Sequence, residues 1–311
     1  MRIFLTGAAG CLGSNLIEHW LPQGHEIFAL DNFATGKREL LPQVQGLRAR
    51  EGSIADAALV EACIAEFKPE LVVHAAASYK DPQDWAEDIA TNVQGAANIA
   101  KSAAAHGVKR IIHFQTNLCF GRPEILPVPN NHRVAPFTSY GITKTAGEQI
   151  LFLGSVPVLS LRLANVTGSR LVSGPIPTFY KRLKEGKSVF CSDTKRDFMD
   201  IADFLNFMEL AMREGAPTGC FNVASGQAHS IKEIFDLVSA HVGVHMPDVP
   251  IVPPADDDVP VMMLDASETK KAFGWELQYS FAQTIARQLA WYDTHGVSDV
   301  FSHLKPASAA A

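Results

Sequence analysis

A glycine-rich segment near the N-terminus constrains the fold more than any other part of the sequence. Gly7, Gly10 and Gly13 follow a β-rich run at residues 2–6 and open a helical run at residues 12–21. In this spacing the first glycine permits a tight turn, and the second lets the backbone approach a pyrophosphate. The third allows close contact between helix and sheet, while the helix N-terminus offers free N–H groups to an anion. We therefore predict a dinucleotide-binding unit at the start of the chain.

Short apolar runs alternate with helical runs through the first half of the chain. Strands are expected at residues 2–6, 26–30, 71–74, 109–114 and 157–163, and helices at 12–21, 54–67, 84–106 and 139–152. Nearly continuous apolar strands between helices indicate a parallel sheet that is covered on both faces. Because crossovers are right-handed, we predict an α/β fold with a doubly wound, Rossmann-type parallel sheet.

The pattern changes after residue 165. Helices are expected at 174–186, 201–213, 230–242, 269–273 and 281–294, and the Pro- and Asp-rich stretch 246–260 predicts an ordered surface loop. We predict that residues 1–165 form the dinucleotide-binding domain. Residues 166–311 form mainly a smaller, mixed α/β substrate lobe, from which segments can return to the main sheet. The ligand cleft should lie at the carboxyl ends of the strands.

Composition excludes several classes of protein. The 311 residues are 47% hydrophobic and 19% charged, with a net charge of -6, which disfavours nucleic acid or an anionic membrane as a partner. The five scattered cysteines lack C-x-x-C spacing, so we expect reduced thiols rather than a disulfide framework or a metal site. The N-terminus opens a strand instead of a signal peptide, and no apolar run is long enough to span a bilayer. We expect a cytoplasmic protein.

An acidic residue closes the second predicted strand. A carboxylate at Asp31 would accept hydrogen bonds from adenine-ribose hydroxyls and repel a 2′-phosphate, which favours NAD over NADP. Lys37 and Arg38 follow closely and could favour NADP, but we interpret them as a solvated basic loop. The predicted cofactor is therefore NAD.

Tyr140 and Lys144 are four residues apart and therefore lie on one face of the helix expected at 139–152. A phenol is a poor base at its ordinary pKa, but a neighbouring ammonium stabilises phenolate and makes the tyrosine usable as a general base and acid. The same lysine can hydrogen-bond the nicotinamide ribose. The pair predicts proton transfer beside a bound nicotinamide.

At this point the chain resembles the extended short-chain dehydrogenases/reductases that modify nucleotide sugars, and the resemblance covers nearly the whole sequence. It rests on the order and spacing of short segments: TGAAGCLGS, the DN of ALDNFATGK, VVHAAA, TNVQG, QTNLCFG, SYGITKTAGE, RLANVTG, KRDFMDIAD, FNVASG and LDASETKKAFGW.

The resemblance implies a set of site residues. The expected NAD contacts are Gly7, Gly10, Cys11, Leu12, Gly13, Asp31, Asn32, Ser53, Ile54, Ala75, Ala76, Ala77, Asn92, Tyr140, Lys144 and Leu163. Thr116 is implied as the hydroxyl that binds the sugar oxygen beside Tyr140. Asn165 and Arg196 are implied as contacts of the nucleotide-sugar diphosphate, although a buried Arg–Asp pair would equally explain Arg196. The family's homodimer is built from two helices per subunit, expected here at 84–106 and 139–152.

Four positions depart from the family pattern or stand out beside it. Ser53 replaces a frequent Asp, which weakens one adenine contact. Residues 254–258 read Pro-Ala-Asp-Asp-Asp where relatives carry a phosphate-binding Arg, and three acids would repel a diphosphate unless they face solvent. Lys80 follows the third predicted strand, where it would meet a carboxylated sugar or simply solvent. Thr116 is followed by Asn117-Leu118 instead of the Asp-Glu of dehydratases.

These features favour an NAD-dependent 4-epimerase of a nucleotide-diphosphate hexose or hexuronic acid that works through a transient keto-sugar. The alternatives are a decarboxylase or 4,6-dehydratase, a ketosugar reductase, and a non-catalytic dinucleotide-sensing protein. Sensing proteins of this superfamily typically lose the Tyr or the Lys, whereas this chain keeps Thr116, Tyr140 and Lys144 together.

Overall fold

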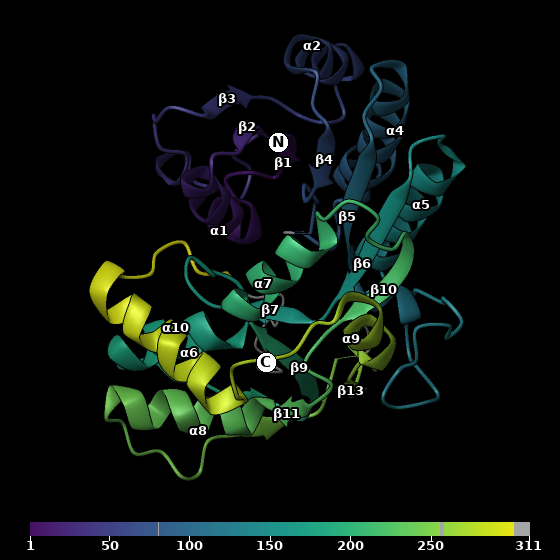
Figure 1. The fold of residues 1–311 in the computed structure, drawn as a ribbon. Coiled ribbons are helices and arrows are strands. Elements are labelled where there is room, and N and C mark those ends of the chain that lie inside the picture. Colours follow the sequence, from purple (N-terminus) through teal and green to yellow (C-terminus); the bar gives the residue numbers. More distant parts are fainter. Residues whose placement is uncertain (80, 256–257, 302–311) are drawn as a thin grey trace.

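The computed structural model describes residues 1–79, 81–255 and 258–301, and a seven-stranded parallel sheet lies at its centre. The strands run in the order β10-β6-β5-β4-β1-β2-β3 (Figure 1). Their bounds are β1 Arg2–Thr6, β2 Glu26–Asp31, β3 Leu47–Glu51, β4 Leu71–His74, β5 Arg110–Thr116, β6 Val158–Leu163 and β10 Gly219–Val223. The order reverses between β1 and β4, which confirms the doubly wound fold and puts the switch point at their carboxyl ends.

Helices cover both faces of the sheet. They are α1 Cys11–Trp20, α2 Ala57–Phe67, α3 Trp85–Asp88, α4 Gly95–Ala105, α5 Ser139–Leu153, α7 Ile201–Ala211 and α9 Ser267–Phe273, with a π-helical turn at Ile89–Gln94 and 3-10 turns at Leu21–Gln23, Arg38–Leu40 and Asn117–Phe120. Alternate residues of β1 face opposite sides, as the period of a strand requires. Phe4 packs with the apolar residues of α2 and α4, and Leu5 packs with those of α1 and α7.

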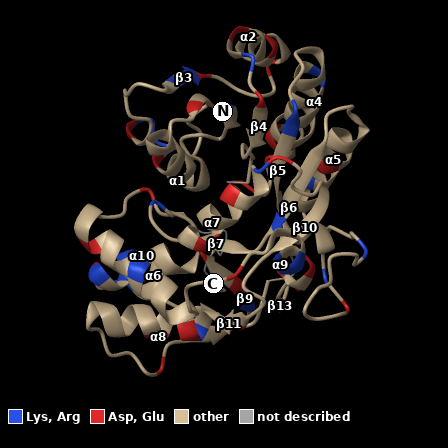
Figure 2. Ribbon diagram, viewed as in Figure 1, with Lys and Arg blue, Asp and Glu red and all other residues tan. Residues whose placement is uncertain are grey.

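A smaller lobe follows β6 in the chain. It contains β7 Asn165–Thr167, α6 Pro175–Lys184, β8 Cys191–Ser192, β9 Lys195–Asp200, β11 Ala228–Ser230, α8 Ile231–Val242, β12 Ile251–Val252, β13 Val261–Met262 and α10 Phe281–His295. Strand β9 pairs with β7, β11 and β13, while α6, α8 and α10 enclose a separate apolar cluster around Phe235 and Tyr292 (Figure 1). Basic and acidic residues are interspersed over both lobes (Figure 2).

Two strands of the main sheet were not predicted from the sequence. Strand β3 reads LRARE and lies at the exposed edge, so it lacks the apolar run that marks a buried strand. Strand β10 comes from the second half of the chain and completes the other edge beside β6. The helix expected at 84–106 is divided by the π-helical turn, and the loop expected at 246–260 contains the short strand β12. Within the described residues, no helix combines the length and apolarity needed to cross a membrane.

Candidate active site

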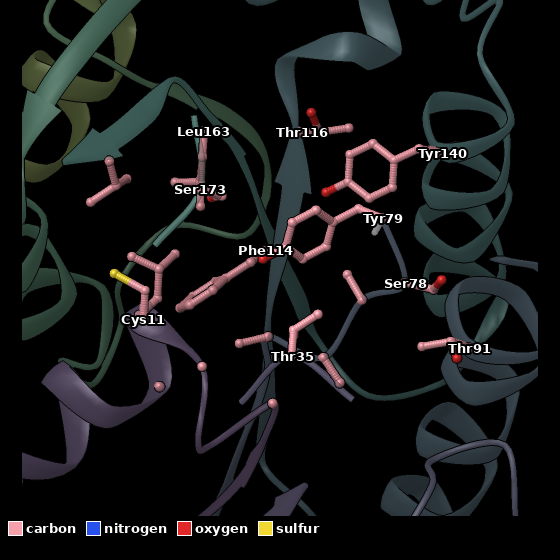
Figure 3. Close-up of a pocket in the computed structure, with 18 of the residues that line it drawn as sticks. Cys11, Thr35, Ser78, Tyr79, Thr91, Phe114, Thr116, Tyr140, Leu163 and Ser173 are labelled. Carbon is pink, nitrogen blue, oxygen red and sulfur yellow. The ribbon is translucent and has the colours of Figure 1, made fainter. Parts of the chain in front are cut away.

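A cavity of about 1250 Å³ opens at the carboxyl ends of the parallel strands and extends to the smaller lobe (Figure 3). Most of the residues expected at the site line it: Gly7, Gly10, Cys11, Leu12, Gly13, Asp31, Asn32, Ser53, Ile54, Ala75, Ala76, Ala77, Thr116, Tyr140, Leu163, Asn165 and Arg196. Asn92 and Lys144 are buried and are not among the lining residues. Lys80 lies outside the described residues.

The glycine turn is closed tightly against the end of β4. Gly7 has a φ of +65°, and a Cβ there would lie 2.6 Å from the backbone nitrogen of Ala76. A Cβ on Gly13 would lie 2.4 Å from the carbonyl oxygen of Gly7. No side chain caps α1 at Gly10, so the first N–H groups of the helix remain available for an anionic group in the cavity.

Asp31 is held at the cavity wall by backbone hydrogen bonds. Its Oδ2 accepts from the N–H of Ala9 and its Oδ1 accepts from the N–H of Phe33, each at 2.8 Å. Burial raises the pKa of Asp31, and the two backbone bonds oppose this shift. The carboxylate is therefore fixed beside the glycine turn, where it can accept hydrogen bonds from the hydroxyls of a ribose.

The two cations after Asp31 are each paired with an acid, and the Arg38–Glu51 pair stays largely exposed, in keeping with a solvated basic loop. The Nζ of Lys37 lies 2.9 Å from Oδ2 of Asp299 and 2.6 Å from Oγ of Ser298. Arg38 pairs with Glu51 and lies over the ring of Phe33. Since each cation already has an acidic partner, neither is free to favour a 2′-phosphate.

Thr116 and Tyr140 lie next to each other at one side of the cavity (Figure 3). Thr116 ends β5, and its hydroxyl accepts from the N–H of Leu118 at 3.1 Å, while Tyr140 lies in the first turn of α5. Burial raises the pKa of Tyr140 above its ordinary value, and the neighbouring Thr116 side chain opposes this shift. Formation of a phenolate at Tyr140 therefore requires positive charge nearby.

Lys144 is the nearest source of such charge along α5. Its side chain is one turn beyond Tyr140, and the residue is only 1% exposed. Burial lowers the pKa of Lys144 to about 7, while Glu148 opposes the shift. The lysine is thus charged below neutral pH and loses its charge above it.

Asn92 acts behind the cavity wall. Its Oδ1 accepts from the N–H of Ser78, and its Nδ2 donates to the carbonyl oxygen of Ser78 and to Oγ1 of Thr143. These bonds tie the loop after β4 to α5. Asn98 similarly donates to the carbonyl oxygen of Ile54 at 2.9 Å and holds the segment that contains Ser53.

Arg196 is paired with an acid at the substrate end of the cavity. It forms an ion pair with Asp258, and both residues line the cavity. The Arg–Asp pair considered as an alternative explanation of Arg196 is therefore present, and it lies at the cavity wall. Of the three acids expected to repel a diphosphate, Asp258 is paired with Arg196, and Asp256 and Asp257 lie outside the described residues. Asn165 lines the cavity beside this pair and donates to the carbonyl oxygen of Asp197 at 2.9 Å.

Several lining residues were not predicted from the sequence. Tyr79 lines the cavity together with Thr35 of the loop after β2 and Ser173 of the smaller lobe (Figure 3). Gly174 has a φ of +89° and precedes Pro175 at the start of α6, where no side chain caps the helix. The Gly-Pro pair is the sequence signal for this second helix N-terminus facing the cavity.

The described residues contain no group of three or more His, Cys, Asp or Glu side chains placed to hold a metal ion. The cavity instead joins a glycine turn, a fixed carboxylate and an adjacent Thr–Tyr pair, with a buried lysine behind its wall. These parts suit an extended, anionic dinucleotide at one end and a second ligand at the other.

Known proteins share this arrangement. The family model described as "NAD dependent epimerase/dehydratase family" matches residues 3–224. The UDP-glucose 4-epimerase of Mycolicibacterium smegmatis is 29% identical over 311 residues, which cover 94% of this chain and 98% of that one. The Bordetella bronchiseptica enzyme WbmG in complex with NAD is 62% identical, with a TM-score of 0.93 and coverage of 98% of each chain. The same enzyme with NAD and UDP has a TM-score of 0.92, 62% identity and coverage of 97% of each chain. The predicted fold, family and cofactor are thereby confirmed, and the chain belongs to the NAD dependent epimerase/dehydratase family.

Proposed function

We propose that the protein is an NAD-dependent 4-epimerase of a UDP-activated sugar. The observation that carries this proposal is the adjacent pair of Thr116 and Tyr140, one helical turn from Lys144, in a cavity that begins at the glycine turn. Support for the nucleotide comes from the relatives: one is named UDP-glucose 4-epimerase, and WbmG has been solved with UDP.

Thr116, Tyr140 and Lys144 each have a distinct task in this reaction. Bound NAD would supply a hydride acceptor that later returns the hydride. Thr116 holds the oxygen of the sugar hydroxyl while Tyr140 accepts its proton, which leaves a ketone. The charge of Lys144 stabilises the phenolate form of Tyr140. After the ketone has turned in the cavity, Tyr140 gives the proton back as the opposite face of the carbon is reduced.

The side chains beside Thr116 favour epimerisation over dehydration. Expulsion of a 6-hydroxyl as water needs an acid and a base near the sugar, but Asn117 and Leu118 do not titrate near neutral pH. Two acids at another part of the cavity are engaged locally. Asp84 caps α3 by accepting from the N–H of Glu87, and Glu87 accepts from Thr91 at 2.8 Å.

The cavity extends over both parts of the chain, and we assign a different ligand to each part. We propose that residues 1–165 bind NAD and that residues 166–311 bind mainly the nucleotide sugar. Arg196, Asn165 and the backbone N–H of Ile176 at the start of α6 offer donors for a diphosphate, which compensates for the missing arginine in the stretch 254–258. Lys80 is also proposed as a sugar contact on the family resemblance.

The test of the reaction is incubation of the enzyme with UDP-, CDP-, GDP- and dTDP-sugars without added reductant. We expect a product of unchanged mass and inverted configuration at C4, seen by mass spectrometry and NMR, and fastest turnover with a UDP-sugar. A product lighter by water or carbon dioxide, or a stoichiometric requirement for NAD(P)H, would contradict the proposal.

The proton-transfer role predicts the behaviour of two variants. Tyr140→Phe should lower kcat by roughly a hundredfold or more and leave NAD binding nearly unchanged, because only the proton-transfer group is lost. Lys144→Met should lower kcat and also weaken NAD binding. Tyr279→Phe, which changes a tyrosine outside the lining of the cavity, is the control and should retain activity. Near-normal kcat in Tyr140→Phe would refute the assignment.

The fixed carboxylate predicts cofactor preference. NAD should bind more tightly than NADP in a titration of the apoprotein, and Asp31→Ala should narrow the difference because it removes the repulsion of a 2′-phosphate. Asp236→Asn removes the same charge from an exposed pair on α8 and serves as the control. Equal affinity for the two cofactors in the unaltered protein would contradict this prediction.

We also propose a cytoplasmic homodimer that is formed through α4 and α5, which lie next to each other (Figure 1). Ile142 and Leu153 of α5 are 50% and 86% exposed, and Ile89 before α4 is 54% exposed, which leaves apolar surface for a second copy. All five cysteines are free, as in reducing compartments.

Charges introduced on this surface should dissociate the dimer. In sedimentation experiments, Ile142→Glu with Leu153→Glu should give monomers. Ile251→Glu changes an exposed apolar residue elsewhere and should leave dimers intact. A monomeric unaltered protein would rule out the proposed assembly.

A further inference from the structure

Buried polar side chains continue along α5 beyond the catalytic pair. Tyr140, Lys144 and Glu148 are spaced by four residues and therefore follow one face of the helix. Glu148 is completely buried, and the family's proton-transfer chemistry leaves it without a task. Burying a carboxylate one helical turn from a buried ammonium costs free energy, which suggests that Glu148 has a role in the site.

Glu148 is held by two residues of β6. Its Oε1 accepts from Oγ of Ser160 at 2.6 Å, and its Oε2 lies 3.2 Å from Nη2 of Arg162. The guanidinium is almost as buried as the carboxylate, with 7% of its side chain exposed. Two opposite charges are thus fixed on the side of Lys144 that is remote from Tyr140.

Other titratable groups lie along this row. His74 of β4 and His113 of β5 act on Lys144, and Cys119 of the turn after β5 and Cys220 of β10 act on Glu148 and Arg162. Asp88 of α3 acts on Tyr140. The two imidazoles have ring centroids 5.0 Å apart, and burial lowers the pKa of both, that of His74 to about 3. Burial raises the pKa of both thiols to about 12.

Near neutral pH these histidines and cysteines are therefore uncharged. Asp88 accepts a hydrogen bond from Ser139 at 2.6 Å and acts on Tyr140. Of the groups along the lysine itself, Glu148 and Arg162 bear the charges that decide its ionisation. They act through a dry interior, where charges one helical turn apart interact strongly.

These two charges have opposite effects. A carboxylate near a buried ammonium favours the charged form of the lysine, and a guanidinium beside that carboxylate cancels part of its field. Since burial, opposed by Glu148, brings the pKa of Lys144 to about 7, small changes in this balance determine whether the lysine is charged near neutral pH.

We propose that Glu148 and Arg162 are positioning residues that together set the charge of Lys144, and through it the readiness of Tyr140 to take the sugar proton. The part concerning Tyr140 rests on the proposed function. The part concerning Lys144 does not, because the lysine is expected to hydrogen-bond the nicotinamide ribose, so that its charge affects NAD binding.

The first measurement follows NAD affinity of the full chain against pH, which is independent of the sugar and of turnover. Binding should weaken as Lys144 loses its proton. Glu148→Gln removes the negative charge, so the midpoint should move to lower pH by about one unit, a tenfold change in the protonation constant. Arg162→Met removes the opposing charge, so the midpoint should move to higher pH. Lys144→Met should abolish the dependence.

The second measurement is the pH dependence of kcat of the holoenzyme with its UDP-sugar. The alkaline limb of the profile, where Lys144 loses its proton, should move in the same direction as the NAD midpoint of each variant. Glu148→Asp keeps the charge and should restore the unaltered profile. Asp203→Asn is a matched control, because this buried carboxylate of α7 accepts from the backbone of Gln278 and Tyr279 and does not line the cavity.

A purely structural ion pair gives a different result. Loss of either partner would then lower thermal stability and activity without moving the midpoints in opposite directions. Midpoints that move in the same direction, or that stay in place in folded variants, overturn the proposal. If Glu148→Gln does not fold, the upward shift in Arg162→Met decides the question. A shift in NAD binding without epimerase activity would refute the proposed function and leave the role at Lys144 standing.

Discussion

The close approach of the β1–α1 turn to the end of β4 is the constraint on which the site depends. Gly7 lies against the backbone of Ala76, and any side chain at Gly7 would force the two segments apart. Because β1 and β4 are neighbours at the point where the strand order reverses, this contact defines the floor of the cavity. Residues at the ends of β2, β5 and β6 can then reach one extended ligand from different sides.

The position of the smaller lobe depends on a buried carboxylate. Asp197 of β9 is fully buried, and it accepts from the N–H of Ser225 at 2.9 Å and of Gly226 at 3.0 Å. Burial raises the pKa of Asp197 to about 6, although the hydrogen bonds oppose the shift. The bonds join the end of the main sheet to β9, and they place the adjacent Arg196 at the cavity wall.

Residues that are close in sequence were predictable, and those that depend on distant partners were not. The glycine turn, Asp31 and the Tyr140–Lys144 spacing follow from local geometry, so the fold and the centre of the site could be predicted. The partner of Lys37 is Asp299, 262 residues away, and the pairing of Arg196 with Asp258 likewise depends on the tertiary fold. Strand β3 was missed because an exposed edge does not require apolar residues.

The same principle explains how the site discriminates between anionic ligands. Cations near the cavity are paired with acids, as Lys37 is with Asp299 and Arg196 is with Asp258. Such pairs lower the net positive charge that an incoming anion meets, whereas the uncapped start of α1 presents N–H groups without an accompanying acid. The start of α6 adds fewer donors, because Pro175 and Pro177 have no backbone N–H. Binding of NAD at the glycine turn therefore depends more on backbone geometry than on free charge, which is consistent with a chain whose net charge is negative.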